Sequence, residues 1–364
     1  MIRVLQCVND MHRAGLETML MNYYRNIDRS KIQFDFLTHR PYKSDYDDEI
    51  ISLGGKVYYA PRLYPQNYSK YFKWMEQFFK EHPEYKIVHS HIDAMSYLPL
   101  KAAKRAGVPV RIAHSHNTSI DKDFKYILKQ YFRSRINSVT TDFCACGEEA
   151  GKFLFGDVRY TIIPNAIDIS KFLFAPEIRR KKREELNIKN EFVIGHVGRL
   201  SYQKNHKFLV QIFNKFVVQN PNSMLLLIGV GEKEEEIKKQ VEGFGLGEKV
   251  KFLGNRTDVN ELYQVMDIFV MPSFFEGVPV VGIEAQFAGL PCIFSDKVPK
   301  EVKFNQKTDF LGLDEPLEIW TKTIEKYKND SREQLLGELE NSFYNIKKAH
   351  ALLENYYLNL ETRE

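Results

Sequence analysis

The chain has 364 residues, of which 43% are hydrophobic and 27% charged, a balance that suits two ordinary domains with buried cores. The lack of any apolar run near 18 residues argues against a membrane-spanning helix, and four cysteines in this length argue against a disulfide framework. A net charge of +4, with no zinc-binding spacing and no nucleic-acid-binding module, predicts no nucleic-acid partner. Because no signal-peptide pattern precedes the first strand, we expect a cytoplasmic protein.

In the first half, apolar runs alternate with amphipathic stretches, which is typical of a parallel sheet covered by helices. The predicted strands are residues 2–8, 34–37, 87–90, 111–114, 143–146 and 161–163. The predicted helices are residues 16–27, 71–81, 97–106 and 124–136. Residues 59–68 carry two prolines and are predicted to form a loop.

Two His-Ser-His triplets end successive predicted strands, at residues 89–91 and 114–116. Side chains at positions i and i+2 share one face of a strand, so each pair of histidines could hold a metal. No cysteine or carboxylate stands at a usual spacing for a third ligand, and we therefore expect no metal site. The triplet Asp121-Lys122-Asp123 opens a predicted helix instead of ending a strand, so we interpret it as a helix cap.

That predicted helix is strongly basic. Residues 101–135 contain nine Lys and Arg but only two acidic residues, and Lys122, Lys125, Lys129 and Arg133 recur at helical spacing among aromatic residues. Such a helix is typical of an element that binds an anionic membrane surface. A solvated helix face above an apolar core stripe is the alternative.

The strand and helix pattern restarts at residue 192. A basic run at residues 179–183 is followed by two glutamates, and we expect an exposed helix there. The predicted strand at 192–200 runs into a loop with two cations, Arg199 and Lys204, where a guanidinium fork and an ammonium group suit a diphosphate. Two ordinary surface cations are the alternative.

Residues 275–284 combine a glycine turn, a proline and two glutamates after an apolar strand. Glu276 is predicted in the strand-to-helix loop, and Glu284 about two turns into the helix. Gly277 permits close approach of a ligand, and Pro279 suits the first helical turn. The backbone N–H groups at this helix start predict a phosphate site. One glutamate would then bind sugar hydroxyls and the other ribose hydroxyls. The alternative is an ordinary helix start with two solvated glutamates.

Together the Gly-Arg…Lys loop and the E-x7-E pair resemble the large retaining glycosyltransferase family 4 (group 1), which has the GT-B fold. The resemblance continues in order along the second half, at residues 225–231, 250–254, 267–273 and 284–291. Within the family, the chain is similar to the branch that builds bacterial capsular polysaccharides and exopolysaccharides, at residues 113–117 and 293–296 and in its Tyr-rich last helix.

The resemblance implies an α/β protein with two Rossmann-like parallel-sheet domains that face each other across a cleft. Residues 1–165 would form the acceptor-side domain, with a C-terminal helix at residues 342–364 packed back on it. Residues 166–341 would bind the nucleotide sugar. The reaction implied is transfer of a hexose or N-acetylhexosamine from a nucleotide diphosphate sugar, a UDP-sugar above all, to a polyprenyl-linked glycan, with retention. It would take place at the anionic inner face of the cell membrane.

The resemblance also assigns roles to single residues, with no metal and no cofactor. Gly15, at the first helix start, would add a backbone N–H to the diphosphate, although Ala14 replaces the family's first glycine. His116, or His114 in its place, would contact the donor sugar. The predicted catalytic residues are His116, Arg199, Lys204 and Glu276. The predicted substrate-binding residues are Gly15, His114, Asn117, Gly277, Val278, Pro279, Val280 and Glu284.

Three other functions remain open at this point. A nucleotide-sugar 2-epimerase shares the fold but needs an acid/base set that the sequence does not reveal. A nicotinamide dehydrogenase would need a third glycine in the loop at residues 229–234. A non-catalytic nucleotide-sugar-binding subunit would be expected to lose charged residues that this chain retains.

Overall fold

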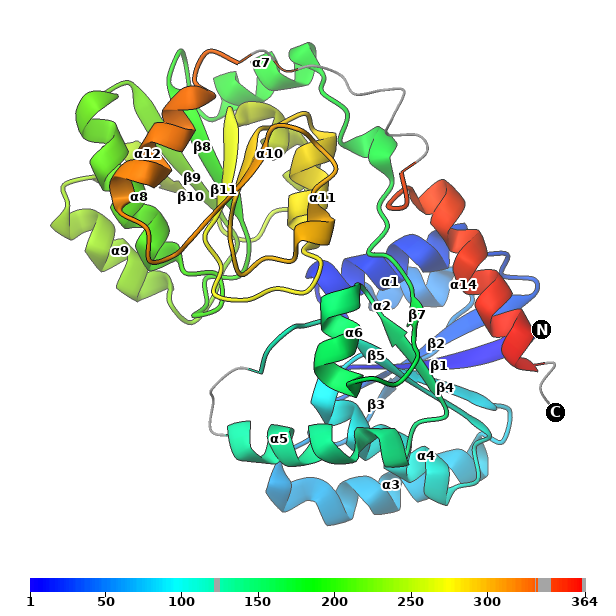
Figure 1. Ribbon diagram of the computed structural model, residues 1–364. Coiled ribbons are helices and arrows are strands. Elements are labelled where there is room, and N and C mark those ends of the chain that lie inside the picture. The colour runs from blue at the N-terminus through cyan, green and yellow to red at the C-terminus, as the bar shows by residue number, and fades with distance from the viewer. Residues whose placement is uncertain (121–124, 331, 333–341, 362–364) are drawn as a thin grey trace. The chain divides into compact units, whose positions relative to one another are not determined.

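The computed structural model describes residues 1–120, 125–330, 332 and 342–361, and the Asp121-Lys122-Asp123 triplet lies outside them. The chain divides into two compact units (Figure 1). Unit 1 contains residues 1–167 and 343–364, and unit 2 contains residues 168–342. Each unit is built on one parallel sheet, which confirms the predicted α/β class with two Rossmann-like domains.

Unit 1 has a seven-stranded parallel sheet with the order β3-β2-β1-β4-β5-β6-β7. Its strands are β1 (Ile2–Val8), β2 (Ile32–Thr38), β3 (Val57–Tyr59), β4 (Ile87–Ser90), β5 (Val110–Ser115), β6 (Asp142–Ala145) and β7 (Thr161–Ile162). The central strands are buried on both faces, which explains their nearly continuous apolar sequences. The edge strand β3 was not predicted, because it has three residues and none of them is fully buried.

Helices cover both faces of this sheet. They are α1 (Gly15–Asn26), α2 (Asp47–Ser52), α3 (Tyr68–Glu81), α4 (Tyr97–Arg105), α5 (Tyr126–Arg135), α6 (Glu148–Phe155) and α14 (Ile346–Glu361). One core holds Tyr23 and Phe34 together with Tyr357 from the C-terminal helix, and the other holds Phe78 and Phe132. Figure 1 shows α14, in red, beside α1, so the end of the chain completes the core of unit 1.

Unit 2 has a six-stranded parallel sheet with the order β10-β9-β8-β11-β12-β13. Its strands are β8 (Phe192–Val197), β9 (Ser223–Ile228), β10 (Val250–Phe252), β11 (Ile268–Met271), β12 (Cys292–Ser295) and β13 (Thr308–Leu311). Its helices are α7 (Pro176–Glu185), α8 (His206–Gln219), α9 (Glu234–Gly243), α10 (Val259–Val265), α11 (Val280–Phe287) and α12 (Leu317–Lys326). The core packs around the buried Trp320 and Phe213.

The basic run at residues 179–183 lies in α7, but the prediction of an exposed helix is wrong for two of its residues. Lys182 and Arg183 are buried, because α7 packs against α10. The Lys182 ammonium lies 2.9 Å from Asp258 and 2.7 Å from Glu261. These cations therefore fasten one helix to another and are not part of a solvated surface.

Strand order decides where each sheet can bind a ligand. In unit 1, β2 and β3 extend the sheet on one side of β1, and β4 begins its extension on the other side, so the strand order reverses between β1 and β4. In unit 2 the same reversal lies between β8 and β11. Ligands of open parallel sheets bind beyond the carboxyl ends of the strands at such a point. Gly15 follows β1, Lys204 follows β8 and Glu276 follows β11, so each lies at the expected edge.

Candidate functional site

The loops after β8 and β11 in unit 2 meet through a buried ion pair. The Lys204 ammonium donates to Glu276 Oε1 at 2.7 Å, and both side chains are largely buried. Gln203 supports the carboxylate, donating from Nε2 to the Phe275 carbonyl at 3.0 Å and to Glu276 Oε2 at 3.3 Å. One predicted cation and one predicted carboxylate thus form a charged, preorganised pair at the edge where a ligand is expected.

The second predicted cation is placed differently. The Arg199 side chain is 73% exposed and lies 3.1 Å from Glu232, a surface carboxylate. The structure therefore gives Arg199 and Lys204 separate carboxylate partners. An exposed pair of this kind is weak, about 0–1 kcal/mol, so a bound diphosphate can compete with Glu232 for the guanidinium.

Two glycines shape the backbone that carries Arg199. Gly229 adopts φ +131°, and a Cβ on it would lie 2.2 Å from the Gly198 carbonyl oxygen. A Cβ on Gly231 would lie 2.3 Å from the Leu200 carbonyl oxygen. This glycine loop lacks the dinucleotide pattern, and its glycines serve instead to let the two loops pack backbone against backbone.

Helix α11 carries Glu284 and begins at Val280. Pro279 precedes the helix in an extended conformation, with φ −72° and ψ 118°, so it caps α11 and does not belong to its first turn. Glu284 is the fifth residue of α11, just over one turn from its start and not two turns as predicted. The loop residues Gly277 and Val278 are buried beside Glu276.

Glu284 lies in an apolar environment and has one hydroxyl partner, which sequence reasoning missed. Tyr263, on α10, donates to Glu284 Oε2 at 2.9 Å. Burial raises the pKa of the Glu284 carboxyl to about 7, and the Tyr263 hydrogen bond only partly offsets this. No sequence pattern connects residues 263 and 284, because they belong to different helices.

The parent protein is expected to lose stability as pH rises and the buried Glu284 carboxyl ionises. Replacing Glu284 with glutamine, which cannot ionise, is expected to remove this loss. A carboxyl with a folded pKa of about 7 and an ordinary value of 4.5 stabilises the fold fully below pH 4.5, and that stability is lost as pH rises to about 7. We therefore expect the difference in free energy of unfolding, variant minus parent, to become about 3 kcal/mol more favourable to the variant as pH rises from about 4.5 to 8. Denaturant titrations measure this difference. Glu242→Gln, at an exposed site, is the control, and a Glu284→Gln difference independent of pH would contradict the prediction.

In unit 1, the start of α1 brings together one predicted and one unpredicted residue. Gly15 is the first residue of α1 and is exposed. Glu17, in the same helical turn, is buried, and this burial raises the pKa of its carboxyl to about 8. A carboxyl that is mostly neutral at pH 7 leaves the positive end of the α1 dipole free to attract an anion.

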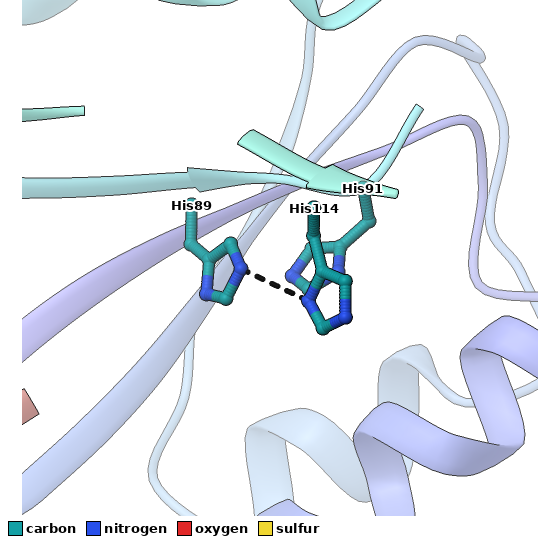
Figure 2. A group of neighbouring side chains, drawn as sticks. All are labelled: His89, His91 and His114. Carbon is teal, nitrogen blue, oxygen red and sulfur yellow. Dashed lines mark hydrogen bonds between the residues drawn. The ribbon is translucent and has the colours of Figure 1, made fainter. Parts of the chain in front are cut away.

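The two His-Ser-His triplets lie at the ends of β4 and β5, which are neighbouring parallel strands. Their register pairs His89 with Ile112, so the triplets are adjacent but offset by two residues. His89 Nε2 lies 3.1 Å from His114 Nδ1, and His91 Nδ1 lies 3.0 Å from His116 Nε2. Figure 2 shows His89, His91 and His114 gathered on one side of the strand ends. Each triplet can therefore supply a third imidazole to the histidine pair of the other, a source of ligands that the search for a cysteine or carboxylate did not consider.

Two polar residues of unit 1 hold these rings. His91 Nε2 donates to Gln6 Oε1 at 2.8 Å, and the Gln6 amide donates to the Tyr357 hydroxyl at 3.1 Å. The same hydroxyl lies 2.7 Å from His89 Nδ1. Burial lowers the pKa of these imidazoles well below 6.5, so they are neutral. His114 Nε2 is buried and has no hydrogen-bond partner in the described part of the chain.

Asp93 positions the loop that follows β5, and sequence reasoning missed it. Its carboxylate accepts a hydrogen bond from the His116 backbone N–H at 2.7 Å and another from Asn117 Nδ2 at 2.8 Å. Asp93 itself has φ +45°, a conformation that costs free energy in a non-glycine residue and is concentrated at functional sites. A lone aspartate carries no motif that could have revealed this role.

Helix α5 differs from the predicted basic face. Lys125 and Arg133 donate hydrogen bonds to backbone carbonyls of neighbouring segments, at 3.0 and 2.8 Å, and Lys122 lies outside the described residues. The side chains that project from α5 include Ile127, 83% exposed, and Tyr131, 51% exposed. The outer face of α5 is therefore more apolar than predicted. Among the helices that the structure describes, none combines the length and apolar character needed to cross a membrane.

Comparison with known proteins agrees with this architecture. The sequence matches the family described as "Glycosyltransferase Family 4" over residues 13–171 and that described as "Glycosyl transferases group 1" over residues 178–343. The putative glycosyltransferase EpsF of Bacillus subtilis (strain 168) is 40% identical over 334 residues, covering 88% of this chain and 86% of EpsF.

Two further proteins are informative. The UDP-Gal:alpha-D-GlcNAc-diphosphoundecaprenol alpha-1,3-galactosyltransferase of Escherichia coli is 32% identical over 228 residues, which cover 58% of each chain. The crystal structure of Anabaena HepE in complex with UDP and glucose has a TM-score of 0.82 at 17% identity and covers 100% of both chains, which shows a shared fold. The two parallel-sheet units thus form a GT-B architecture, and the chain belongs to the group 1, family 4 glycosyltransferases.

Proposed function

We propose that this glycosyltransferase moves a hexose or N-acetylhexosamine from a UDP-sugar to a polyprenyl-linked glycan, with retention, during synthesis of a bacterial surface polysaccharide. The name of the Escherichia coli relative supports both substrate classes, since it contains a UDP-sugar donor and a diphosphoundecaprenol acceptor. The similarity of residues 113–117 and 293–296 to capsular and exopolysaccharide enzymes supports the pathway.

The observation that carries this proposal is the buried Lys204–Glu276 pair beyond β8 and β11. In the proposed reaction the bond between C1 of the sugar and the diphosphate oxygen breaks, and negative charge grows on the leaving group. Lys204, Arg199 and backbone N–H groups at helix starts would stabilise that charge. A buried cation already in position needs little reorganisation when this charge develops.

The remaining groups would hold the donor. Glu276 would accept hydrogen bonds from sugar hydroxyls with help from the backbone of residues 277–280, and Glu284 would accept them from the ribose. No carboxylate stands out as a nucleophile, so we propose attack of the acceptor hydroxyl on the face that the diphosphate leaves. The new bond joins C1 to the acceptor oxygen, and the acceptor proton passes to the leaving diphosphate oxygen. No metal is needed in this scheme.

Donor and metal dependence test the proposal together. With a panel of nucleotide sugars and a polyprenyl-diphosphate monosaccharide, we expect release of UDP that requires the acceptor and persists after treatment with a chelator. NMR spectroscopy of the product should show the donor's anomeric configuration. Conversion of the sugar to its C2 epimer without an acceptor would favour an epimerase. Loss of activity with chelator and rescue by Mn²⁺ or Mg²⁺ would contradict metal independence.

A polyprenyl-linked acceptor also requires contact with the inner membrane surface, and we propose that α5 makes it. Binding to anionic vesicles is expected to fall with added salt, since each cation near such a surface contributes about 1 kcal/mol. Replacing the four predicted cations with glutamine should reduce co-sedimentation, and Ile127→Gln with Tyr131→Gln should reduce it further by removing exposed apolar area. If vesicle binding does not depend on lipid charge and is unchanged by both sets of substitutions, α5 is a solvated surface helix and not the membrane contact.

A further inference from the structure

We propose that His89, His91 and His114 form a binding site for one divalent transition-metal ion of the Zn²⁺ class, at the carboxyl edge of the unit 1 sheet. One ring nitrogen from each residue belongs to a set whose members all lie within 4.8 Å of one another. His89 lies in β4, His91 directly follows that strand, and His114 lies in the neighbouring strand β5.

The spacing of the nitrogens suits a tetrahedral ion. Zn–N bonds of about 2.0–2.1 Å place two bound nitrogens about 3.3 Å apart. His89 Nε2 and His114 Nδ1 are already 3.1 Å apart, as the dashed line in Figure 2 marks. Because the third nitrogen lies within 4.8 Å, a small rotation of one ring completes the set.

The second ring nitrogens of His89 and His91 have the partners that metal-binding histidines use. A ligating imidazole usually donates its second N–H to a fixed acceptor, which orients the ring. His91 Nε2 donates to Gln6 Oε1 at 2.8 Å, and His89 Nδ1 lies 2.7 Å from the Tyr357 hydroxyl. The neutral rings of His91 and His89 can each keep their one proton on the nitrogen that faces Gln6 or Tyr357. A metal ion can then bind the lone pair of the other ring nitrogen without releasing a proton to solvent.

His114 supplies an independent reason for a ligand. Its Nε2 is buried without a hydrogen-bond partner among the described residues, although buried ring nitrogens normally have one. Ligation removes this deficit only through Nε2, which requires rotation of the His114 ring, because ligation through Nδ1 leaves Nε2 unpaired. His116 stands at the outer side of the cluster, 3.0 Å from His91, and is the one imidazole of the four that remains partly exposed. An ion can therefore enter beside His116.

The ligand chemistry selects the class of ion. Imidazole nitrogens favour Zn²⁺, Co²⁺, Ni²⁺ and Cu²⁺, whereas Mg²⁺ and Mn²⁺ prefer oxygen ligands. Chelator-resistant transfer and a transition-metal site are therefore compatible. One consequence rests on the proposed function: an ion on this cluster would bind beside or on the histidine predicted to contact the donor sugar, which is His116, or His114 in its place. Zn²⁺ should therefore inhibit transfer, and chelator should restore it.

Metal titration of the full chain, without a polyhistidine tag, tests the site directly. After removal of metals, Co²⁺ should bind as one equivalent with the intense visible absorption of a low-coordinate complex, and Zn²⁺ should displace it one for one. Mg²⁺ should not compete. Tyr357→Phe, which removes one outer partner, should weaken binding by about 10- to 100-fold. His91→Gln should abolish it, and His206→Gln, in unit 2, should leave it unchanged.

X-ray absorption spectroscopy of the Zn²⁺-loaded parent protein avoids any dependence on variants that fail to fold. Three imidazole ligands would support the site. Fewer than two, or no stoichiometric Co²⁺ spectrum, would overturn it as surface binding only. Stoichiometric binding without inhibition would support the metal site and contradict the predicted contact of His116, or His114 in its place, with the donor sugar. Inhibition with no bound ion at this cluster would overturn the metal site.

Discussion

Replacing Lys204 with alanine is expected to lower kcat/KM for sugar transfer about a hundredfold. The ammonium group is buried 2.7 Å from Glu276, and a preorganised charge that meets the leaving diphosphate contributes about 3 kcal/mol to transition-state stabilisation. Steady-state assays of acceptor-dependent UDP release measure the change. Arg199→Ala is expected to have a similar effect, provided that the guanidinium leaves Glu232 for the diphosphate.

Two controls separate catalysis from folding. Lys207→Ala removes an exposed cation at the start of α8, three residues after Lys204, and should leave activity unchanged. Lys204→Ala also strands a buried carboxylate at Glu276, so some loss of stability is expected and must be measured by thermal unfolding. Near-normal transfer by folded Lys204→Ala and Arg199→Ala proteins would refute the assignment of this loop to the diphosphate.

Glu276 and Glu284 are expected to affect different steps. Glu284→Ala should weaken UDP binding by roughly 10- to 100-fold, the size expected for hydrogen bonds to a charged group. Glu276→Ala should leave UDP affinity nearly intact and lower kcat with the sugar donor, since its partners are the sugar hydroxyls. Isothermal titration calorimetry with UDP and steady-state kinetics with the UDP-sugar separate the two effects.

Tyr263→Phe is a matched test of the Glu284 role. It removes the hydroxyl that donates to Glu284 Oε2 at 2.9 Å while keeping the ring, so UDP affinity should fall less than in Glu284→Ala. Turnover at saturating donor should not change. If neither Glu276→Ala nor Glu284→Ala alters UDP affinity or turnover, the E-x7-E pair only marks the start of a helix and does not bind the donor.

Much of the fold follows from local sequence, because strands buried on both faces of a parallel sheet are rich in apolar residues. β1, β4 and β8 were found in this way. The edge strand β3 was missed, because its partly exposed residues carry a weaker signal, although the short edge strand β7 was predicted. For the same reason the basic run of α7 was misjudged: periodicity does not reveal that Lys182 faces three carboxylates.

The candidate site was predictable only in part. Lys204 and Glu276 stand in loops that follow strongly apolar strands, and this context revealed them. Their contact could not be foreseen in detail, and neither could the pairing of Arg199 with Glu232, since side-chain partners depend on loop conformation. Asp93 and Tyr263 gave no signal at all, because each acts through a residue distant in sequence.

The amino-acid sequence by itself determined the alternation of strands and helices, and with it the placement of polar residues just beyond the strand ends. Only the tertiary structure decided which of those ends are neighbours. β8 pairs with β11 across three intervening α-helices and two intervening strands of the chain, which brings Lys204 to Glu276. The β4–β5 register likewise joins two histidine pairs into one cluster. Strand order and register are set by packing and hydrogen bonding across the whole sheet, which local periodicity does not encode.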